Sequence, residues 1–166
     1  MIKLTFITLG KLKEKYLRDA VDEYAKRLSR YCKLDIVELN PISLSEKPSQ
    51  SEIEAALSKE AEMIEKRIPE NSVVTALCIE GKGNTSEQFA EFVDKNINSG
   101  KNMCFIIGSS YGLSDIVKQK ADLKLSLSKM TFPHQLFRVM MLEQVYRAFK
   151  INEGGTYHKY LGNFNC

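Results

Sequence analysis

The sequence predicts a single α/β domain in which a parallel sheet is covered by helices on both faces. Short apolar segments alternate along the chain with longer segments whose apolar residues recur at helical spacing. The segments 72–79 and 103–107 are apolar on both faces, as strands of a parallel sheet are when helices cover both sides. A length of 166 residues corresponds to about one domain, which can bury a core without disulfides.

Each element follows from local composition. Strands are expected at 2–9, 34–39, 72–79, 103–107 and 123–127, where short runs are rich in apolar residues. Helices are expected at 12–31, 53–68, 85–97, 114–121 and 133–151. Thr85 and Gln88 form a capping box, Ser114 can cap the short helix, and Pro133 suits the first turn of the last one. Residues 81–84 are expected to form a turn, and 40–51 a loop that holds two prolines and four serines.

The topology directs attention to three loops. In open α/β sheets ligands bind beyond the carboxyl ends of the strands. The candidate binding loops are therefore 80–85, 108–113 and 128–132, which follow the third, fourth and fifth strands. Glycine-containing loops of this kind are more often simple turns than ligand cradles, so the topology alone leaves both interpretations open.

Several functional classes are disfavoured by what the sequence lacks. The four cysteines form no CxxC pair and the two histidines no HExxH motif, so neither a disulfide framework nor a metal site is expected. The motifs GxxxxGK[ST], GxGxxG and GxSxG do not occur, which disfavours P-loop, dinucleotide and serine-hydrolase chemistry. No apolar run is long enough to span a membrane and no cleavage site follows the first strand, so a cytoplasmic protein is expected.

Basic residues gather near both ends of the chain. Residues 11–33 carry eight basic and four acidic side chains, and residues 129–159 carry five and two. If the fold joins these regions they form one polyanion-binding surface, and otherwise they are solvated helix faces.

The last predicted helix is apolar around most of its circumference. Its apolar residues between positions 136 and 149 are Leu136, Phe137, Val139, Met140, Met141, Leu142, Val145, Tyr146, Ala148 and Phe149. A helix of this kind is buried on more than one side, either in a core or against a second subunit. We expect the second side to lie in a dimer interface.

The C-terminal third of the sequence resembles one family. The residues that carry the resemblance are LSLSKMTFPHQ at 125–135, Arg138, EQVYRAFKI at 143–151 and YHK at 157–159. The segments GKLKEKY at 10–16 and EYAKRL at 23–28, with Gly108 and Gly112, extend it over about residues 1–159. Together they are similar to the SPOUT-type 23S rRNA methyltransferases that methylate N3 of a pseudouridine in the large ribosomal subunit.

The resemblance implies an architecture and a cofactor. It implies an α/β knot, in which the C-terminal segment threads through a loop, as one domain over 1–159 with a tail at 160–166. It implies S-adenosylmethionine as methyl donor, held by three loops at Leu77, Gly108, Leu127, Ser128, Lys129, Met130, Thr131 and Phe132. It also implies an obligate homodimer packed through the last helix, with each site completed by the partner, acting on 23S rRNA in the large subunit or the 70S ribosome.

Candidate catalytic residues follow from the chemistry of that substrate. Direct displacement at a sulfonium methyl requires an oriented nucleophile, and N3 of pseudouridine carries a weakly acidic proton. His158 is the candidate general base, since an ordinary histidine pKa lies near neutral pH. Tyr157 is expected to stack on or hydrogen-bond the base, and Arg138 and Lys159 to offset anionic charge. His134 is expected to shape the cofactor loop. Without the resemblance, YHK is simply a polar tail, and Arg138 a buried structural charge.

Two departures from the family pattern leave alternatives open. The family usually has two adjacent glycines where this chain has Gly108 and Ser109, and it commonly ends just after YHK. The serine would support a non-catalytic RNA-binding or ribosome-assembly protein with the same fold. A SPOUT enzyme acting on another RNA, such as tRNA, is a third possibility.

Overall fold

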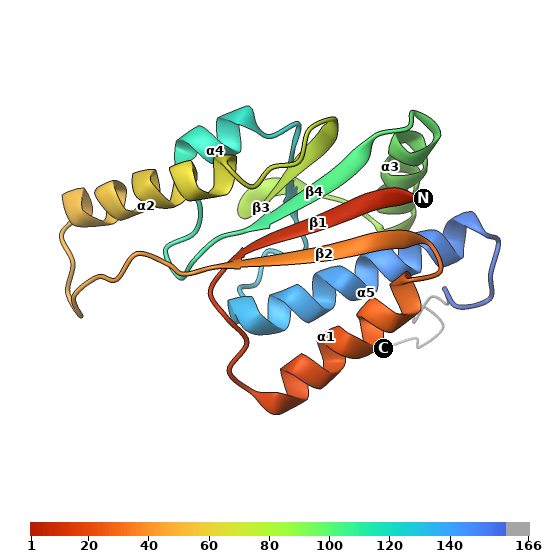
Figure 1. Cartoon of the computed structure of the whole chain (residues 1–166), viewed down its shortest axis with the longest axis horizontal. Coiled ribbons are helices and arrows are strands. Elements are labelled where there is room, and N and C mark those ends of the chain that lie inside the picture. Colours follow the sequence, from red (N-terminus) through yellow and green to blue (C-terminus); the bar gives the residue numbers. More distant parts are fainter. Residues whose placement is uncertain (159–166) are drawn as a thin grey trace.

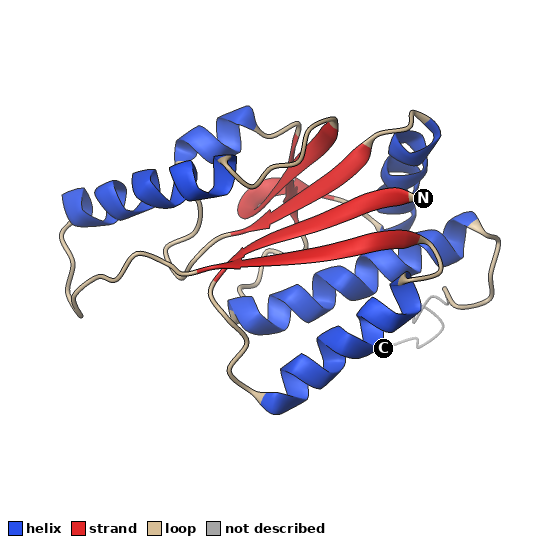
Figure 2. Cartoon of the chain, in the orientation of Figure 1, coloured by secondary structure: helices blue, strands red, loops and turns tan. Residues whose placement is uncertain are grey.

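The structure is a computed structural model that describes residues 1–158, and it is built on a five-stranded sheet with helices on both faces (Figures 1 and 2). The strands are β1 (Ile2–Leu9), β2 (Cys32–Leu39), β3 (Ser72–Gly83), β4 (Asn102–Ile107) and β5 (Leu123–Ser126). The helices are α1 (Lys15–Leu28), α2 (Gln50–Glu65), α3 (Ser86–Asn98), α4 (Asp115–Lys120) and α5 (His134–Asn152). The predicted α/β class is confirmed. The knot and the extent of the domain stay predictions, and 159–166 lie outside the described residues.

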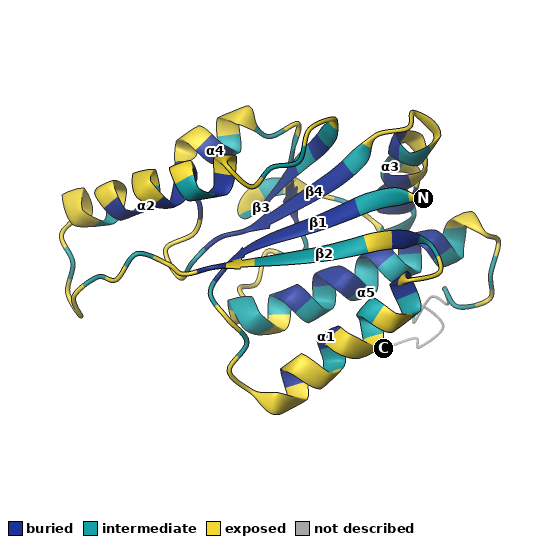
Figure 3. Ribbon diagram, viewed as in Figure 1, coloured by how far each residue is buried: buried dark blue, intermediate teal, exposed yellow. Residues whose placement is uncertain are grey.

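All neighbouring strands run parallel, in the order β2-β1-β4-β3-β5. Helices α1, α3 and α5 cover one face, while α2 and α4 cover the other (Figure 1). The central strands β1 and β4 are buried on both faces (Figure 3), which explains their continuous apolar sequences. Phe6 and Phe105 stack between these two strands with ring centroids 5.1 Å apart. The carboxyl ends of all five strands therefore lie at one edge of the sheet.

Side-chain caps fix three helix starts. Thr85 and Gln88 form the predicted capping box of α3, and the Ser114 hydroxyl accepts from the Val117 N–H at the start of α4. A further capping box, Ser49 with Glu52, begins α2 three residues before the predicted start. The first apolar residue of the helical pattern, Ile53, lies inside the helix, so periodicity alone placed its beginning too late.

The predicted turn at 81–84 is wrong in part. Strand β3 continues to Gly83, and its pairing with β5 shifts register between Leu77 and Lys82. After this irregularity Lys82 and Gly83 pair with Leu125 and Ser126. The polar, glycine-containing sequence hides the extension, because backbone pairing with β5 sustains the strand without apolar side chains.

Much of the apolar surface of α5 is buried within the chain itself. The helix packs between α1 and α3 on one face of the sheet, with Met141, Leu142 and Val145 in the core. Leu136 remains 38% exposed, and Val139 and Met140 are half-buried. Among the described residues no helix is long and apolar enough to cross a membrane.

Candidate active site

A cavity of about 600 Å³ opens at the carboxyl edge of the sheet, where β3, β4 and β5 end. Its walls are the segments 77–80, 107–113, 126–128 and 130–134, together with Lys118 and Phe137. These segments include parts of the three loops that topology predicted. Seven of the eight residues expected to bind the cofactor line the cavity, namely Leu77, Gly108, Leu127, Ser128, Met130, Thr131 and Phe132. Lys129 is exposed and is not among the residues that form its wall.

The loop after β5 is held by its own side chains. The Ser126 hydroxyl donates to the Ser128 carbonyl at 2.9 Å, and the Ser128 hydroxyl accepts from the Met130 N–H at 3.0 Å. Such short-range bonds fix a turn of the backbone. This turn holds the part of the loop that lines the cavity, which includes Leu127 and Phe132.

The loop after β4 depends on a close backbone approach at Gly108. A Cβ atom added there would lie 2.3 Å from the Gly112 carbonyl oxygen, so no larger residue fits without a shift of backbone. Ser109, which departs from the family pattern, donates from its hydroxyl to Glu60 on α2 at 3.2 Å. The additional hydroxyl therefore links the loop to α2.

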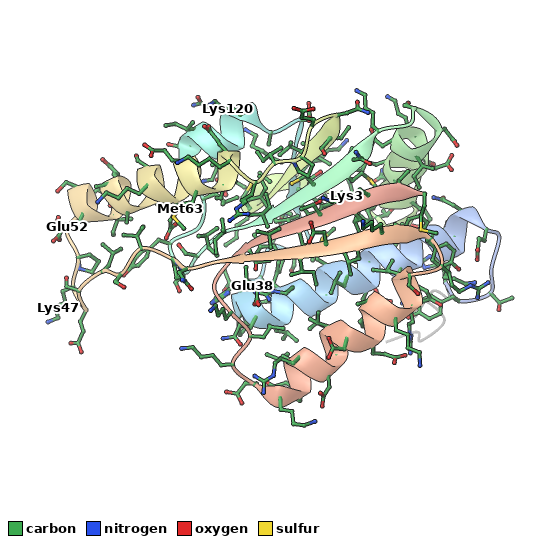
Figure 4. All side chains as sticks on the ribbon, in the orientation of Figure 1. Lys3, Glu38, Lys47, Glu52, Met63 and Lys120 are labelled. Atoms are coloured by element: carbon green, nitrogen blue, oxygen red, sulfur yellow. The ribbon has the colours of Figure 1, made fainter. Side chains whose placement is uncertain are left out.

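Arg138 lies beneath the surface and not in the wall of this cavity. It is 1% exposed, and its guanidinium donates to Glu38 at 2.7 Å and to the Gly10 carbonyl at 3.0 Å. Glu38 extends from the end of β2, where Figure 4 labels it. His134, at the start of α5, lines the cavity and packs on Gly10, whose positive φ of 119° suits a glycine. Arg138 and His134 thus fix the loop that follows β1.

Tyr157 and His158 lie against the middle of α5, outside the wall of this cavity. The Tyr157 hydroxyl donates to Glu143 at 3.1 Å, and its ring packs edge-on against Tyr146. Burial and the Glu143 carboxylate raise the pKa of Tyr157 to about 12, so its hydroxyl keeps its proton at neutral pH.

The His158 ring is held between two charged groups. Its Nε2 lies 2.8 Å from Glu87, at the start of α3, and its Nδ1 lies 3.2 Å from the Arg147 guanidinium. Because a guanidinium only donates, Nδ1 accepts and Nε2 carries the hydrogen. Lys159, the other expected charge, lies outside the described residues.

Comparison with known proteins identifies the family. A family model described as "Predicted SPOUT methyltransferase" matches residues 2–158. The chain belongs to the SPOUT methyltransferase family. It is 53% identical over 159 residues to "Ribosomal RNA large subunit methyltransferase H" of Clostridium acetobutylicum, and 48% identical to the protein of that name in Clostridioides difficile. Each alignment covers 95% of this chain and 100% of the relative.

A solved structure shares the fold of this chain. It is a "probable methylase family protein" from Haemophilus influenzae Rd KW20, with a TM-score of 0.51 and 16% sequence identity. The alignment covers 96% of this chain and 70% of that chain. The expected enzyme class is confirmed, and S-adenosylmethionine is the methyl donor of this SPOUT enzyme.

The SPOUT cavity fits this donor in size and chemistry. Its volume lies within the range of about 300–1,000 Å³ typical of small-molecule sites. Leu77, Ile107 and Phe132 supply apolar surface for an adenine ring. At one wall, Lys118 and Glu80 form an ion pair, and the Lys118 ammonium holds the pKa of the Glu80 carboxyl below its ordinary value. An ammonium and a carboxylate together match the zwitterionic amino-acid end of the donor.

Sequence reasoning missed this ion pair and did not consider the loop after β1. Glu80 and Lys118 lie on separate elements, and no motif connects them. Lys11 and Lys13 stand out in the sequence only as part of a basic region. The β1 loop was not among the predicted binding loops, although β1 also ends at this edge of the sheet.

Proposed function

We propose that the protein transfers a methyl group from S-adenosylmethionine to N3 of a pseudouridine in 23S rRNA. The substrate is the large subunit or the assembled 70S ribosome, and the reaction takes place in the cytoplasm. The active form of the enzyme is a homodimer. The observation that carries the proposal is the identity of about half to relatives named for large-subunit rRNA methylation, over their full length. The cavity at the sheet edge supplies the donor site that this reaction needs.

The donor is held by the three loops at the sheet edge. Leu77, Gly108 and residues 127–132 would hold it, and when bound it supplies an electrophilic methyl group on a sulfonium. The chain's own contribution is orientation, since reacting atoms must come within about 3–3.5 Å in line. The loop after β5 is fixed by the Ser126 and Ser128 hydrogen bonds, and the loop after β4 by the close approach at Gly108.

His158 is proposed to take the proton from N3. For this, the His158 Nδ1 gives up the hydrogen bond that it accepts from Arg147. It then accepts the N3–H of the substrate base and takes up that proton. The resulting imidazolium keeps its Nε2–H on the Glu87 carboxylate, which stabilises the positive charge. Arg147 stays in place during the exchange, because Glu143 accepts from its Nε and Nη2 at 3.1 and 2.6 Å. Tyr157, anchored on Glu143, is positioned to contact the base.

A homodimer reconciles the position of these residues with the position of the donor. Tyr157 and His158 do not line the donor cavity of their own chain, so we propose that they act at the cavity of the partner. The interface would be formed by the part of α5 that the protomer leaves uncovered, which includes Leu136, Val139 and Met140. Burial of this apolar surface would favour association by about 25 cal/mol per Å².

Arg138 is proposed to act through the loop after β1. Two of its nitrogens are already bonded to Glu38 and Gly10, and the whole side chain is buried. The Glu38 carboxylate offsets its charge, and its hydrogen bonds position the loop.

A binding measurement and an activity measurement separate this proposal from its alternatives. Calorimetry with S-adenosylmethionine should show binding, whereas a non-catalytic RNA-binding protein would give no heat of binding. Transfer of radiolabelled methyl to ribosomes that lack the modification should exceed transfer to tRNA under the same conditions. Preferential labelling of tRNA would favour the third possibility and would contradict the proposal.

A further inference from the structure

A second cavity adjoins the donor cavity. Its volume is about 480 Å³, and it lies beyond the ends of β1 and β2, between the loop 10–14, the loop 40–49, helix α2 and the start of α5. Four residues line both cavities, namely Ser109, Ser110, Tyr111 and His134. The two chambers therefore share one wall at the carboxyl edge of the sheet.

The second cavity combines an apolar floor with a basic rim. Leu9, Ile42 and Leu57 contribute apolar surface, while Lys11 and Lys13 are exposed at its edge. Among the described residues that line it, Glu60 is the one carboxylate. It is 4% exposed and accepts hydrogen bonds from the Ile42 N–H at 3.0 Å and from the Ser109 hydroxyl at 3.2 Å.

The backbone that carries the two lysines is fixed by long-range hydrogen bonds. The Gly10 N–H donates to the Leu39 carbonyl at 2.8 Å, the Leu12 N–H to Glu38 at 3.3 Å and the Lys13 N–H to Gln135 at 3.0 Å. Arg138 binds the Gly10 carbonyl from below, and Arg18 donates to the Lys13 carbonyl at 2.7 Å. A preorganised loop loses little entropy when a ligand binds it.

Two aromatic rings occupy the shared wall. Tyr111 is 46% exposed and offers a ring face on which a nucleobase could stack. His134 is half-buried, and burial together with Arg138 and Lys13 lowers its pKa below the ordinary 6.5. At neutral pH it is therefore an uncharged ring with one donor and one acceptor nitrogen, suited to the edge of a base.

We propose that the second cavity receives the nucleotide that is methylated, with its phosphate at Lys11 and Lys13 and its base on the shared wall of Tyr111 and His134. Enzymes that modify a base inside a folded nucleic acid extrude it into a pocket lined by stacking and hydrogen-bonding groups. Stacking on an aromatic ring stabilises a bound base, and phosphate contacts add salt-dependent affinity. The shared wall places such a base beside the donor. The inference rests on the proposed function, since it assigns a position to the substrate of that reaction.

The variant that tests this assignment is the double substitution Lys11→Met and Lys13→Met. Its matched control is Lys15→Met, because Lys15 belongs to the same basic segment but forms an ion pair with Asp19 at 2.6 Å and does not line the cavity. All three lysines are exposed, so each variant is expected to fold.

Binding is measured first, independently of activity. Pseudouridine 5′-monophosphate is titrated into protein saturated with S-adenosylhomocysteine, and its binding is followed by ligand-observed NMR. The double variant should lose about tenfold or more in nucleotide affinity, while Lys15→Met and wild type remain equal. Affinity for S-adenosylmethionine, measured by calorimetry, should be the same in all three proteins.

Single-turnover methylation of ribosomes is measured next. The half-saturating ribosome concentration should rise in the double variant, and the slope of log affinity against log salt should fall by about one for each phosphate that the variant no longer binds. Unchanged nucleotide binding in the double variant would overturn the assignment. Weaker S-adenosylmethionine binding in that variant would overturn it too, since the lysines would then hold the amino-acid end of the donor. If the wild type binds the nucleotide through these lysines but leaves ribosomes unmethylated, the cavity assignment stands and the proposed rRNA reaction fails.

Discussion

Substitution of Gly108 by alanine should remove most of the stabilisation that the methyl donor confers. The added Cβ would lie 2.3 Å from the Gly112 carbonyl oxygen and 2.5 Å from its carbon, so the loop after β4 must move. Overpacking of this kind costs about 1–3 kcal/mol of folding stability. Because the same loop forms a wall of the donor cavity, its displacement should also weaken donor binding.

The magnitude follows from ligand linkage. At about 100 times its dissociation constant, a ligand that binds only the native state raises the free energy of unfolding by about 2.7 kcal/mol. For a chain of this size that gain corresponds to a rise of roughly 5–11 °C in Tm. In Gly108→Ala, donor binding weakened 100-fold would leave a gain below about 1 kcal/mol at the same concentration.

The assay is thermal unfolding with and without S-adenosylmethionine. The matched control is Gly83→Ala, since a Cβ at Gly83 meets no atom within 4 Å. The control should keep the full shift in Tm. Because the readout is the shift and not the Tm itself, a general loss of stability does not obscure it. Equal shifts in Gly108→Ala and wild type would refute the reasoning about this loop.

Three further predictions concern the C-terminus, the interface and pH. Truncation after Thr156 should abolish ribosome methylation, while calorimetry shows little change in donor affinity. His158→Ala alone should slow single-turnover methyl transfer by roughly 10²–10⁴-fold. Full activity of the truncated protein would eliminate Tyr157 and His158 from the mechanism. Met140→Glu should convert the proposed dimer to a monomer in sedimentation and abolish activity, because an unpaired charge buried in an interface costs several kcal/mol. Val145 is unsuitable for this test because it lies in the core of the chain. A fully active Met140→Glu monomer would contradict the shared site. Because the pKa of His134 is lowered in the folded protein, the unfolded chain takes up a proton at this residue first as pH falls through about 6.5. His134 should therefore reduce the free energy of unfolding below that pH. Denaturation at pH 7.5 and 5.5 should show a smaller loss of unfolding free energy on acidification for His134→Gln than for wild type.

The fold could be predicted because burial on two faces leaves a clear pattern. Strands β1 and β4 read as continuous apolar runs, and the capping residues Thr85 and Ser114 mark helix starts by local chemistry alone. The errors occur where long-range pairing decides the structure. The extension of β3 to Gly83 depends on pairing with β5, about 40 residues away in the sequence. The local sequence of residues 80–83 carries no pattern that predicts a strand.

In the candidate site too, features set by local sequence could be predicted, and features set by long-range contacts could not. The three loops that line the cavity at the sheet edge were predictable as neighbours, because parallel strands end at one edge. The burial of Arg138 was not predictable from its place on α5, since it depends on Glu38 and on the carbonyl of Gly10. The contact of Ser109 with Glu60 also joins segments that are distant in the sequence.

The central claim is the identity of the methylated nucleotide, and mass mapping of 23S rRNA tests it most directly. Ribosomal RNA from a strain that lacks this protein is compared with RNA from the same strain after the gene is restored, and with purified ribosomes incubated with the protein and S-adenosylmethionine. We predict that one pseudouridine gains a single methyl group at N3 in the restored strain and in the purified reaction, and lacks it in the deletion strain. A 23S rRNA with identical modifications in all samples would contradict the account.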